Sequence, residues 1–156
     1  MFALTIDQRS SRRTSDAVPG LVAVLNERAL VRPFERTAGD EVQGLTDRAD
    51  LVVEILVELA RRQAWWAGVG VGAVEDDLPA SVRASRGTAL VAARDAVDRA
   101  KHSTAGVAVS GGEDVDAAAV EDVETAAQVL GLLVGSRSGE GHEAVAVMTD
   151  GVTQSE

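Results

Sequence analysis

Cysteine is absent from this chain of 156 residues, and histidine occurs only twice. Without cysteine the chain can form neither a disulfide bond nor a thiolate-based zinc site. The two histidines, His102 and His142, are too far apart in the sequence to form a metal-binding pair on one helical turn. The sequence therefore gives no support for zinc or for histidine-based catalysis, and no motif indicates haem or flavin.

Positive charge is scarce as well. The 15 Lys and Arg residues face 25 Asp and Glu residues, which leaves a formal net charge of −10. Because a protein that coats nucleic acid or an anionic membrane needs surplus positive charge, the chain as a whole fits neither role. It also lacks a long apolar run and an apolar leader, so neither a membrane span nor secretion is predicted. We expect a cytoplasmic protein without membrane contact.

Three common sequence motifs of enzymes are missing too. The chain has no G-x-x-x-x-G-K-[ST] phosphate loop and no G-x-S-x-G nucleophile elbow. The stretch Gly68–Gly72 reads G-x-G-x-G, which does not fit the dinucleotide fingerprint G-x-G-x-x-G. Its three glycines would share one bare face of a strand, which favours close packing of a helix there, with a ligand as the alternative.

What the sequence does contain is a succession of short apolar runs and amphipathic segments. We expect strands over Phe2–Ile6, on both sides of the Gly39-Asp40 turn, within Ala64–Val74 and over Thr104–Ser110. Helices are expected from Asp16, from a cap at Asp50, over Thr88–His102 and from a cap at Asp114 or Asp116. A short apolar segment through Met148 should then lead to a turn at Asp150-Gly151.

This order predicts an α/β chain of the α+β class. We expect a ferredoxin-like or palm-type sandwich, in which helices pack on one face of a mostly antiparallel sheet and further helices follow at the C-terminal end. Residues 1–110 would form the palm-like domain, and residues 111–156 a helical extension.

The hairpin tip carries the clearest candidate site. Asp40 and Glu41 are adjacent there, and Asp7 ends the first expected strand. If that strand lies beside the hairpin, the three carboxylates converge and offer oxygen ligands suited to Mg²⁺ or Mn²⁺. Each acid also fits an ordinary turn or surface position, so a metal site of Asp7, Asp40 and Glu41 is a hypothesis.

Arginines in the neighbouring loops could complement such a site. Their guanidinium groups suit phosphate, and the glycine of the turn would let a ligand approach the backbone. The candidate phosphate-binding residues are Arg9, Arg12, Arg13, Arg36, Gly39, Arg83 and Arg86. The alternative is that these arginines are solvated partners of surplus acids. The ligand would be a nucleotide or another phosphorylated small molecule.

Two features near the C-terminal end bear on partners. A heptad-like stripe follows the last caps and can either close the core or face a second copy in a homodimer: Val120, Val123, Ala127, Leu130 and Val134. The final "TQSE", Thr153–Glu156, fits a capping box and predicts the start of another helix. We therefore expect the natural polypeptide to continue beyond Glu156.

Four segments together resemble the SatD-like family of bacterial proteins: "TIDQRSSRR", "FERTAGDEVQGL", "GVGVGAV" and "SRGTALVAARDAVDRAK". The resemblance spans roughly Phe2–Lys101. It implies a helix-turn-helix segment after the α/β part, through which DNA would be bound, and it implies no defined activity. A more distant likeness links Ala38–Val42 to the GG-[DE]-E-F hairpin of nucleotidyl cyclases, which implies metal-binding roles for Asp7, Asp40 and Glu41.

These observations lead to one expected function and two alternatives. We expect a cytoplasmic regulatory module that binds a nucleotide or phosphorylated ligand with a divalent metal and is linked to a C-terminal DNA-binding segment. The first alternative is a metal-dependent nucleotidyl cyclase, transferase or phosphohydrolase. The second is a scaffold that dimerises through the heptad-like stripe.

Overall fold

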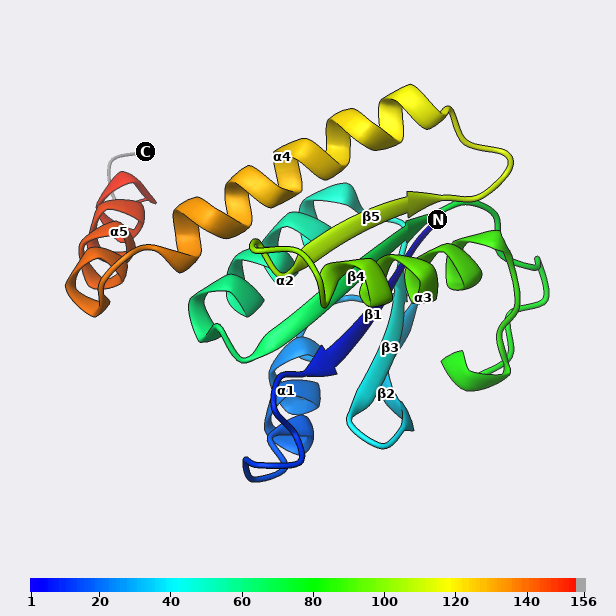
Figure 1. Ribbon diagram of the computed structural model, residues 1–156, viewed down its shortest axis with the longest axis horizontal. Coiled ribbons are helices and arrows are strands. Elements are labelled where there is room, and N and C mark those ends of the chain that lie inside the picture. The colour runs from blue at the N-terminus through cyan, green and yellow to red at the C-terminus, as the bar shows by residue number, and fades with distance from the viewer. Residues whose placement is uncertain (154–156) are drawn as a thin grey trace.

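Five strands of the computed structural model form one sheet, and helices lie on both of its faces (Figure 1). The structure describes the backbone of residues 1–153 and the side chains of residues 1–148. In chain order the elements are β1 (Phe2–Gln8), α1 (Val18–Leu25), β2 (Arg32–Ala38), β3 (Glu41–Thr46), α2 (Ala49–Arg62), β4 (Trp65–Val71), the 3₁₀ turn η1 (Val82–Ala84), α3 (Thr88–Ala100), β5 (Val107–Gly111), α4 (Ala117–Gly135) and α5 (Gly139–Thr153).

The strand order is β2-β3-β1-β4-β5. The central strand β1 is antiparallel to both β3 and β4, whereas the edge strand β5 is parallel to β4. The first four strands, with α1 and α2 between them, have the β-α-β-β-α-β order of a ferredoxin-like unit. The predicted α+β class, with a mostly antiparallel sheet and C-terminal helices, is confirmed.

Helices cover both faces of this sheet, so the expectation of helices on one face was wrong. Leu4 and Ile6 of β1 point into the larger core, where they meet α1 and α2. Ala3, whose side chain points to the opposite face, belongs to a second cluster with Ala89 and Ala93 of α3. Because β1 presents apolar side chains on both faces, each face requires a covering helix.

Helix α3 packs directly on the backbone of β4. A Cβ atom added to Gly68 would lie 2.2 Å from the Val97 nitrogen, and one added to Gly70 would lie 2.0 Å from the Ala89 oxygen. Both glycines therefore leave room for the helix backbone, as the glycine alternation predicted. Gly72 lies beyond the end of β4, and a Cβ there would lie 2.5 Å from the Thr88 hydroxyl oxygen.

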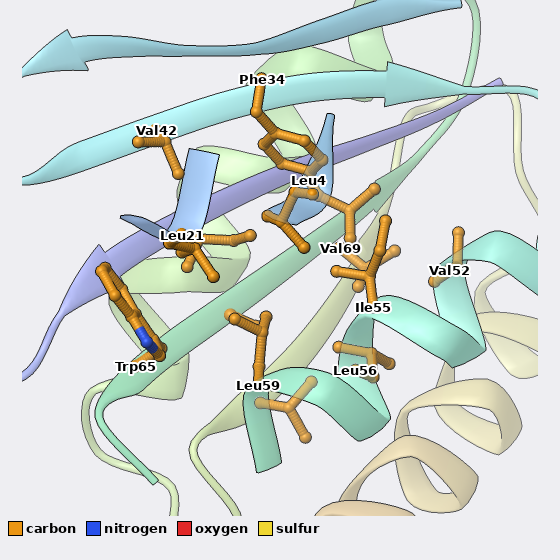
Figure 2. Packing of buried hydrophobic residues seen from close by; sticks show 14 of the residues in the cluster. Leu4, Leu21, Phe34, Val42, Val52, Ile55, Leu56, Leu59, Trp65 and Val69 are labelled. Atoms are coloured by element: carbon orange, nitrogen blue, oxygen red, sulfur yellow. The ribbon is translucent and has the colours of Figure 1, made fainter. Parts of the chain in front are cut away.

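The larger core fills the space between the sheet and the helices α1, α2 and α4. Figure 2 shows Leu4, Phe34 and Val69 of the sheet directed toward Ile55 and Leu56 of α2. Ala127 of α4 joins this cluster, so α4 shares the core of the first 110 residues. In Figure 1, α5 extends away from the sheet beyond the end of α4.

The heptad-like stripe of α4 faces this core. Ala127 and Val134 are buried, Val120 and Leu130 pack against the core, and Val123 is 52% exposed. The stripe thus closes the fold, which was one of its two predicted roles. No helix in the part of the chain that the structure describes is long and apolar enough to cross a membrane.

The helix ends agree with the sequence only in part. Asp116 caps α4, because its carboxylate accepts a hydrogen bond from the Ala118 amide at 3.1 Å. Asp50 lies inside the first turn of α2, where its side chain pairs with Arg48. The turn predicted at Asp150-Gly151 was wrong, because α5 continues through both residues.

The predicted capping box over Thr153–Glu156 cannot be compared in the same way. Its last three residues lie outside the described part of the chain. The helix that it predicts therefore stays a prediction.

The outer edge of β5 is covered by two side chains. Glu124 of α4 accepts a hydrogen bond from the Val109 amide at 2.9 Å, and Arg99 of α3 donates one to the Val109 carbonyl at 2.5 Å. Arg99 and Glu124 also form an ion pair at 2.5 Å. The pair therefore joins α3, β5 and α4 through one strand residue.

We predict that Gly70→Ala destabilises the fold by at least about 3 kcal/mol, because the added methyl group would overlap the backbone of α3. Gly20→Ala is the matched control, since Gly20 lies exposed in α1 with open space around it. The control should stabilise by about 0.5 to 1 kcal/mol. Urea unfolding of both variants checks the prediction, and equal stabilities would contradict it.

We predict that Glu124→Gln lowers the free energy of unfolding by about 1 to 2 kcal/mol at neutral pH, because the charged partner of Arg99 and Val109 is lost. Arg99 lowers the pKa of Glu124 below its ordinary value. The stabilisation is therefore present above the ordinary pKa and is lost as the pH falls through the lowered one. Unfolding curves of wild type and variant should accordingly converge in acid. The exposed neighbour Glu121, changed to Gln, should show no such difference.

Candidate functional site

The register of β1 brings the predicted acids together. Asp7 lies directly opposite Glu41 of β3 and opposite Trp66 of β4. The end of the first strand therefore meets the tip of the hairpin, which is the arrangement that the metal hypothesis required.

The hairpin tip consists of Gly39 and Asp40. Ala38 and Glu41 pair on either side of these two residues. Gly39 has a φ of +56°, a left-handed conformation that glycine adopts without strain, and this explains the glycine of the turn. The Ser11 side chain and the Asp7 carboxyl group are the neighbours that act on the pKa of Asp40. The Glu41 carboxylate instead accepts a hydrogen bond from the Thr37 hydroxyl.

Lys101, immediately after α3, completes the cluster. Its Nζ lies 2.8 Å from Asp7 Oδ2 and 3.0 Å from Asp98 Oδ1. Asp7 is buried to a large extent, since 16% of its side chain is exposed, whereas Asp98 is 76% exposed. One ammonium group thus bridges a partly buried carboxylate and a solvated one.

The electrostatics distinguish the two acids at the tip. Burial raises the pKa of Asp7, the Lys101 ammonium opposes this, and the Asp40 carboxyl group adds to it. Burial would also raise the pKa of Asp40, but hydrogen bonds from Ser11 and Asp7 outweigh it and lower the pKa. Asp7 raises the pKa of Lys101, which keeps the ammonium charged. A proton between the two carboxyl groups would therefore reside on Asp7.

Asp7 and Asp40 border an open cavity of about 380 Å³. Its lining combines the two acids with the loop that follows β1 and with one aromatic side chain: Asp7, Gln8, Ser10, Ser11, Arg12, Arg13, Asp40 and Trp66. We call this cavity the Asp7–Asp40 pocket. Of the seven predicted phosphate-binding residues, Arg12 and Arg13 line it, and both are exposed.

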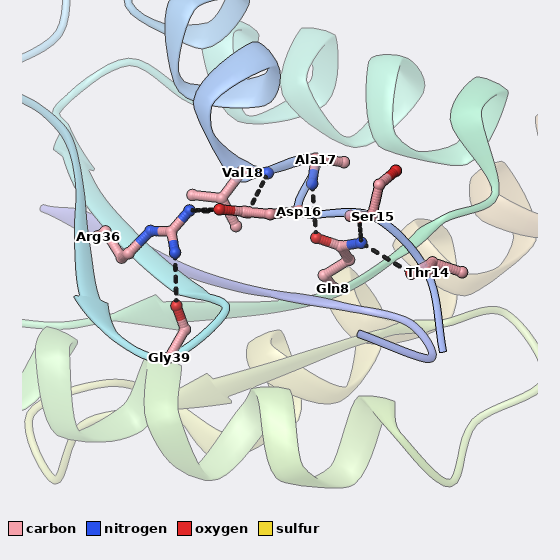
Figure 3. A network of polar contacts seen from close by, with 8 residues as sticks. All are labelled: Gln8, Thr14, Ser15, Asp16, Ala17, Val18, Arg36 and Gly39. Atoms are coloured by element: carbon pink, nitrogen blue, oxygen red, sulfur yellow. Dashed lines mark hydrogen bonds and ion pairs between the residues drawn. The ribbon is translucent and has the colours of Figure 1, made fainter. Parts of the chain in front are cut away.

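The loop over the pocket is held by a polar network (Figure 3). The Gln8 side-chain amide donates hydrogen bonds to the Thr14 hydroxyl and the Ser15 carbonyl, and its oxygen accepts one from the Ala17 amide. These bonds join the end of β1 to the start of α1. The loop that forms one wall of the pocket is therefore held in place by hydrogen bonds within the protein.

Arg36 also helps to hold this loop in place. Its guanidinium group binds both carboxylate oxygens of Asp16, at 2.7 and 2.6 Å, and donates to the Gly39 carbonyl at 3.1 Å (Figure 3). It therefore ties the hairpin to the segment before α1. Its predicted role in phosphate binding is not what this geometry shows, because the guanidinium group is already paired.

Arg9 is also engaged in the structure. Its Nε donates to the Trp65 carbonyl at 2.9 Å, and its guanidinium carbon lies 5.6 Å from the centroid of the Trp66 ring. A Cβ on Gly106 would lie 1.8 Å from Arg9 Nη2, so this glycine makes room for the arginine. Burial lowers the pKa of Arg9. Arg9 thus connects the end of β1 to the start of β4.

Arg83 and Arg86 lie at the other end of the sheet. They follow β4, which runs antiparallel to β1, so the chain leaves β4 beside Phe2 and away from Asp7. Val82, next to Arg83, packs with Ala3 near the start of β1. The structure therefore does not bring these two arginines together with the acids, and their role in phosphate binding stays a prediction.

Lys101, Asp98, Ser11 and Trp66 were not among the predicted site residues. The signal for Lys101 and Asp98 was indirect. The glycines of β4 predict a helix packed on the strand beside β1, and the length of α3 then carries its last turn to the end of β1. A lysine at a helix C-terminus is otherwise ordinary, because it complements the helix dipole.

Among the residues that the structure describes, no group of three or more His, Cys, Asp or Glu side chains is placed to hold a metal ion. The protein would therefore supply two carboxylates, those of Asp7 and Asp40. This matches the way Mg²⁺ is commonly bound, by one or two carboxylates with water and ligand phosphate completing its shell. Asp7 Oδ1 is buried and has no hydrogen-bond partner within the described part of the chain.

Comparisons with known proteins do not add to this geometry. No family model matches the sequence, and no curated protein or solved structure matches it significantly. The resemblance to SatD-like proteins and to nucleotidyl cyclases therefore stays a prediction.

We predict that Asp7→Asn stabilises the protein at pH 7. A raised pKa means that the folded state holds the Asp7 proton more tightly than the unfolded state, so ionising Asp7 costs stability as the pH rises. Asparagine removes this cost, and the gain should fade in acid, where Asp7 is protonated in both states. Melting temperatures across pH check this. Asp98→Asn is the control with little expected change, and a less stable Asp7→Asn variant at pH 7 would contradict the prediction.

Proposed function

We propose that the Asp7–Asp40 pocket binds the phosphate groups of a nucleotide or another phosphorylated ligand together with Mg²⁺ or Mn²⁺. The observation that carries the proposal is the meeting of two carboxyl groups and two exposed arginines around one open cavity. Each component alone has an ordinary surface explanation. Their convergence from β1, from the loop that follows β1 and from the hairpin supports a ligand-binding site.

The acids suit the cation. Carboxylate oxygens are hard ligands of the kind that Mg²⁺ and Mn²⁺ prefer. Two negative groups in contact at a partly buried position repel each other, and a divalent cation between them would relieve this repulsion. Relief of this kind favours cation binding at neutral pH.

The loop suits the phosphate. Arg12 and Arg13 follow the strand that carries Asp7, and the Gln8 network fixes the segment that follows them. Arginine pairs with phosphate through two parallel hydrogen bonds, which Lys cannot reproduce. A chain with a net charge of −10 repels an anionic ligand over most of its surface. The adjacent Arg12 and Arg13 would attract such a ligand locally, beside the bound cation.

The module is regulatory in this proposal, in the sense that ligand binding would alter the part of the chain that follows α4. A C-terminal DNA-binding segment, implied by the SatD-like resemblance, and a homodimer are parts of the same proposal. Support for such coupling comes from α4, which shares the core with the strands that carry the site and leads directly to α5.

An enzyme is the second candidate. Asp7 at a strand end, beside a hairpin acid, is the geometry that supports a metal-dependent nucleotidyl cyclase, transferase or phosphohydrolase. The contact of Lys101 with Asp7 bears on both candidates alike, because each places a divalent cation on the same carboxyl group.

We predict that a nucleoside triphosphate with Mg²⁺ or Mn²⁺ raises the melting temperature of the protein, and that Asp40→Asn abolishes the rise. Asp40 would contribute one of the two cation ligands, so its amide should weaken binding by at least about tenfold. Glu41→Gln is the matched control, because the Glu41 carboxylate is bound to Thr37. It should leave the thermal shift intact.

Turnover distinguishes the two candidates. A regulatory module should leave the nucleotide unchanged after prolonged incubation, whereas an enzyme should release pyrophosphate or phosphate in a reaction that Asp40→Asn stops. A melting temperature that no cation and nucleotide combination changes at millimolar concentrations would contradict the proposal as a whole.

A further inference from the structure

We propose that Lys101 is an internal counterion that competes with the divalent cation for Asp7 and moves to Asp98 when the cation binds. This inference rests on the proposed function of the Asp7–Asp40 pocket and specifies how the pocket is regulated. Its basis is the position of one ammonium group between a partly buried carboxylate and an exposed one.

Lys101 and a cation cannot share Oδ2 of Asp7 in the present geometry. Lys101 Nζ lies 2.8 Å from Asp7 Oδ2, in the space where a metal bound to that oxygen would sit at about 2.0 to 2.1 Å. The two positive groups would also repel each other at this separation. Cation binding through Oδ2 therefore requires Lys101 to leave.

Asp98 provides the place to which Lys101 can move. Its Oδ1 already lies 3.0 Å from Lys101 Nζ, one helical turn back along α3. Because Asp98 is 76% exposed and Lys101 33% exposed, the ammonium group would gain water as it leaves Asp7. The charged groups that face Lys101 are Asp7, Asp98 and, at longer range, Asp40. The movement thus needs a side-chain rotation and no change in the backbone.

The competition has a functional consequence. With Lys101 on Asp7, the carboxylate pair is partly neutralised, so a cation alone binds weakly. A ligand that brings its own negative charge together with the cation favours the displaced arrangement. The pocket would therefore respond to the cation–phosphate complex more strongly than to the free cation.

Binding of Mn²⁺ alone tests the inference, measured from the electron paramagnetic resonance signal of free Mn²⁺. Lys101→Met should bind Mn²⁺ at least tenfold more tightly than wild type. Lys101→Arg keeps the charge and should stay near wild type. Arg94→Met is the matched control, since Arg94 is an exposed cation on the same helix, and it reports the general effect of losing one positive charge. Adding Asp7→Asn to Lys101→Met should remove the gain.

Asp98→Asn tests the same inference by removing the second carboxylate partner of Lys101. Without Asp98, Lys101 has a single partner, so Mn²⁺ should bind more weakly than to wild type and more weakly than to Asp95→Asn, an exposed control on α3. If Lys101→Met does not fold, which circular dichroism would show, this comparison decides. Equal affinities of the Asp98 and Asp95 variants would then overturn the inference.

The possible failures are distinguishable. Mn²⁺ binding by wild type with equal or weaker binding by Lys101→Met would overturn the counterion role and leave the cation site standing. No Mn²⁺ binding by folded Lys101→Met would overturn the inference, whereas the proposed function is decided separately by the thermal shift with nucleotide and cation. A gain in Lys101→Met no larger than that in Arg94→Met would reduce Lys101 to a general charge effect and would also overturn the inference.

Discussion

The contact between the backbone of α3 and the bare face of β4 is the constraint on which the rest of the structure depends. With any larger residue at Gly68 or Gly70, the helix would have to rise from the sheet, because the added Cβ would overlap helix backbone atoms. The low position of α3 lets Ala93 pack on Ala3 of β1 and carries the last turn to the far end of that strand. Gly68 and Gly70 thus let the helix run close to the sheet, Trp66 of the same strand packs under its last turn, and Lys101 follows that turn within reach of Asp7. The position of Lys101 in the candidate site therefore depends on the packing of α3 against β4.

The same contact accounts for an uncommon topology. The crossovers β3-α2-β4 and β4-α3-β5 both connect parallel strands and shift the chain in the same direction across the sheet, yet α2 and α3 lie on opposite faces (Figure 1). The two crossovers must then have opposite hands, and only one can follow the right-handed rule. The close fit of α3 on glycine is the interaction that stabilises the less common arrangement.

Local patterns predicted the elements, but not which side chains would be engaged with one another. Periodicity located the strands and helices, and Gly39-Asp40 located the hairpin, because these signals depend on neighbouring residues. The convergence of Asp7 with the hairpin followed from one assumption about strand adjacency. Arg9 and Arg36 are indistinguishable in sequence from Arg12 and Arg13. Only the folded chain shows that the guanidinium groups of Arg9 and Arg36 already bind protein groups. Lys101 was missed because nothing local relates a helix end to a strand 94 positions earlier (101 − 7).

The side chains on Val109 have a consequence for the sheet as a whole. An edge strand normally offers its free amide and carbonyl groups to any passing chain. Here a carboxylate takes the place of a neighbouring carbonyl and a guanidinium group takes the place of a neighbouring amide, so the pair imitates the peptide group of a sixth strand. A foreign strand could join β5 only by first separating two opposite charges. The β5 edge is thus blocked at Val109, and addition of a strand at this point is opposed by an ion pair that also joins two helices.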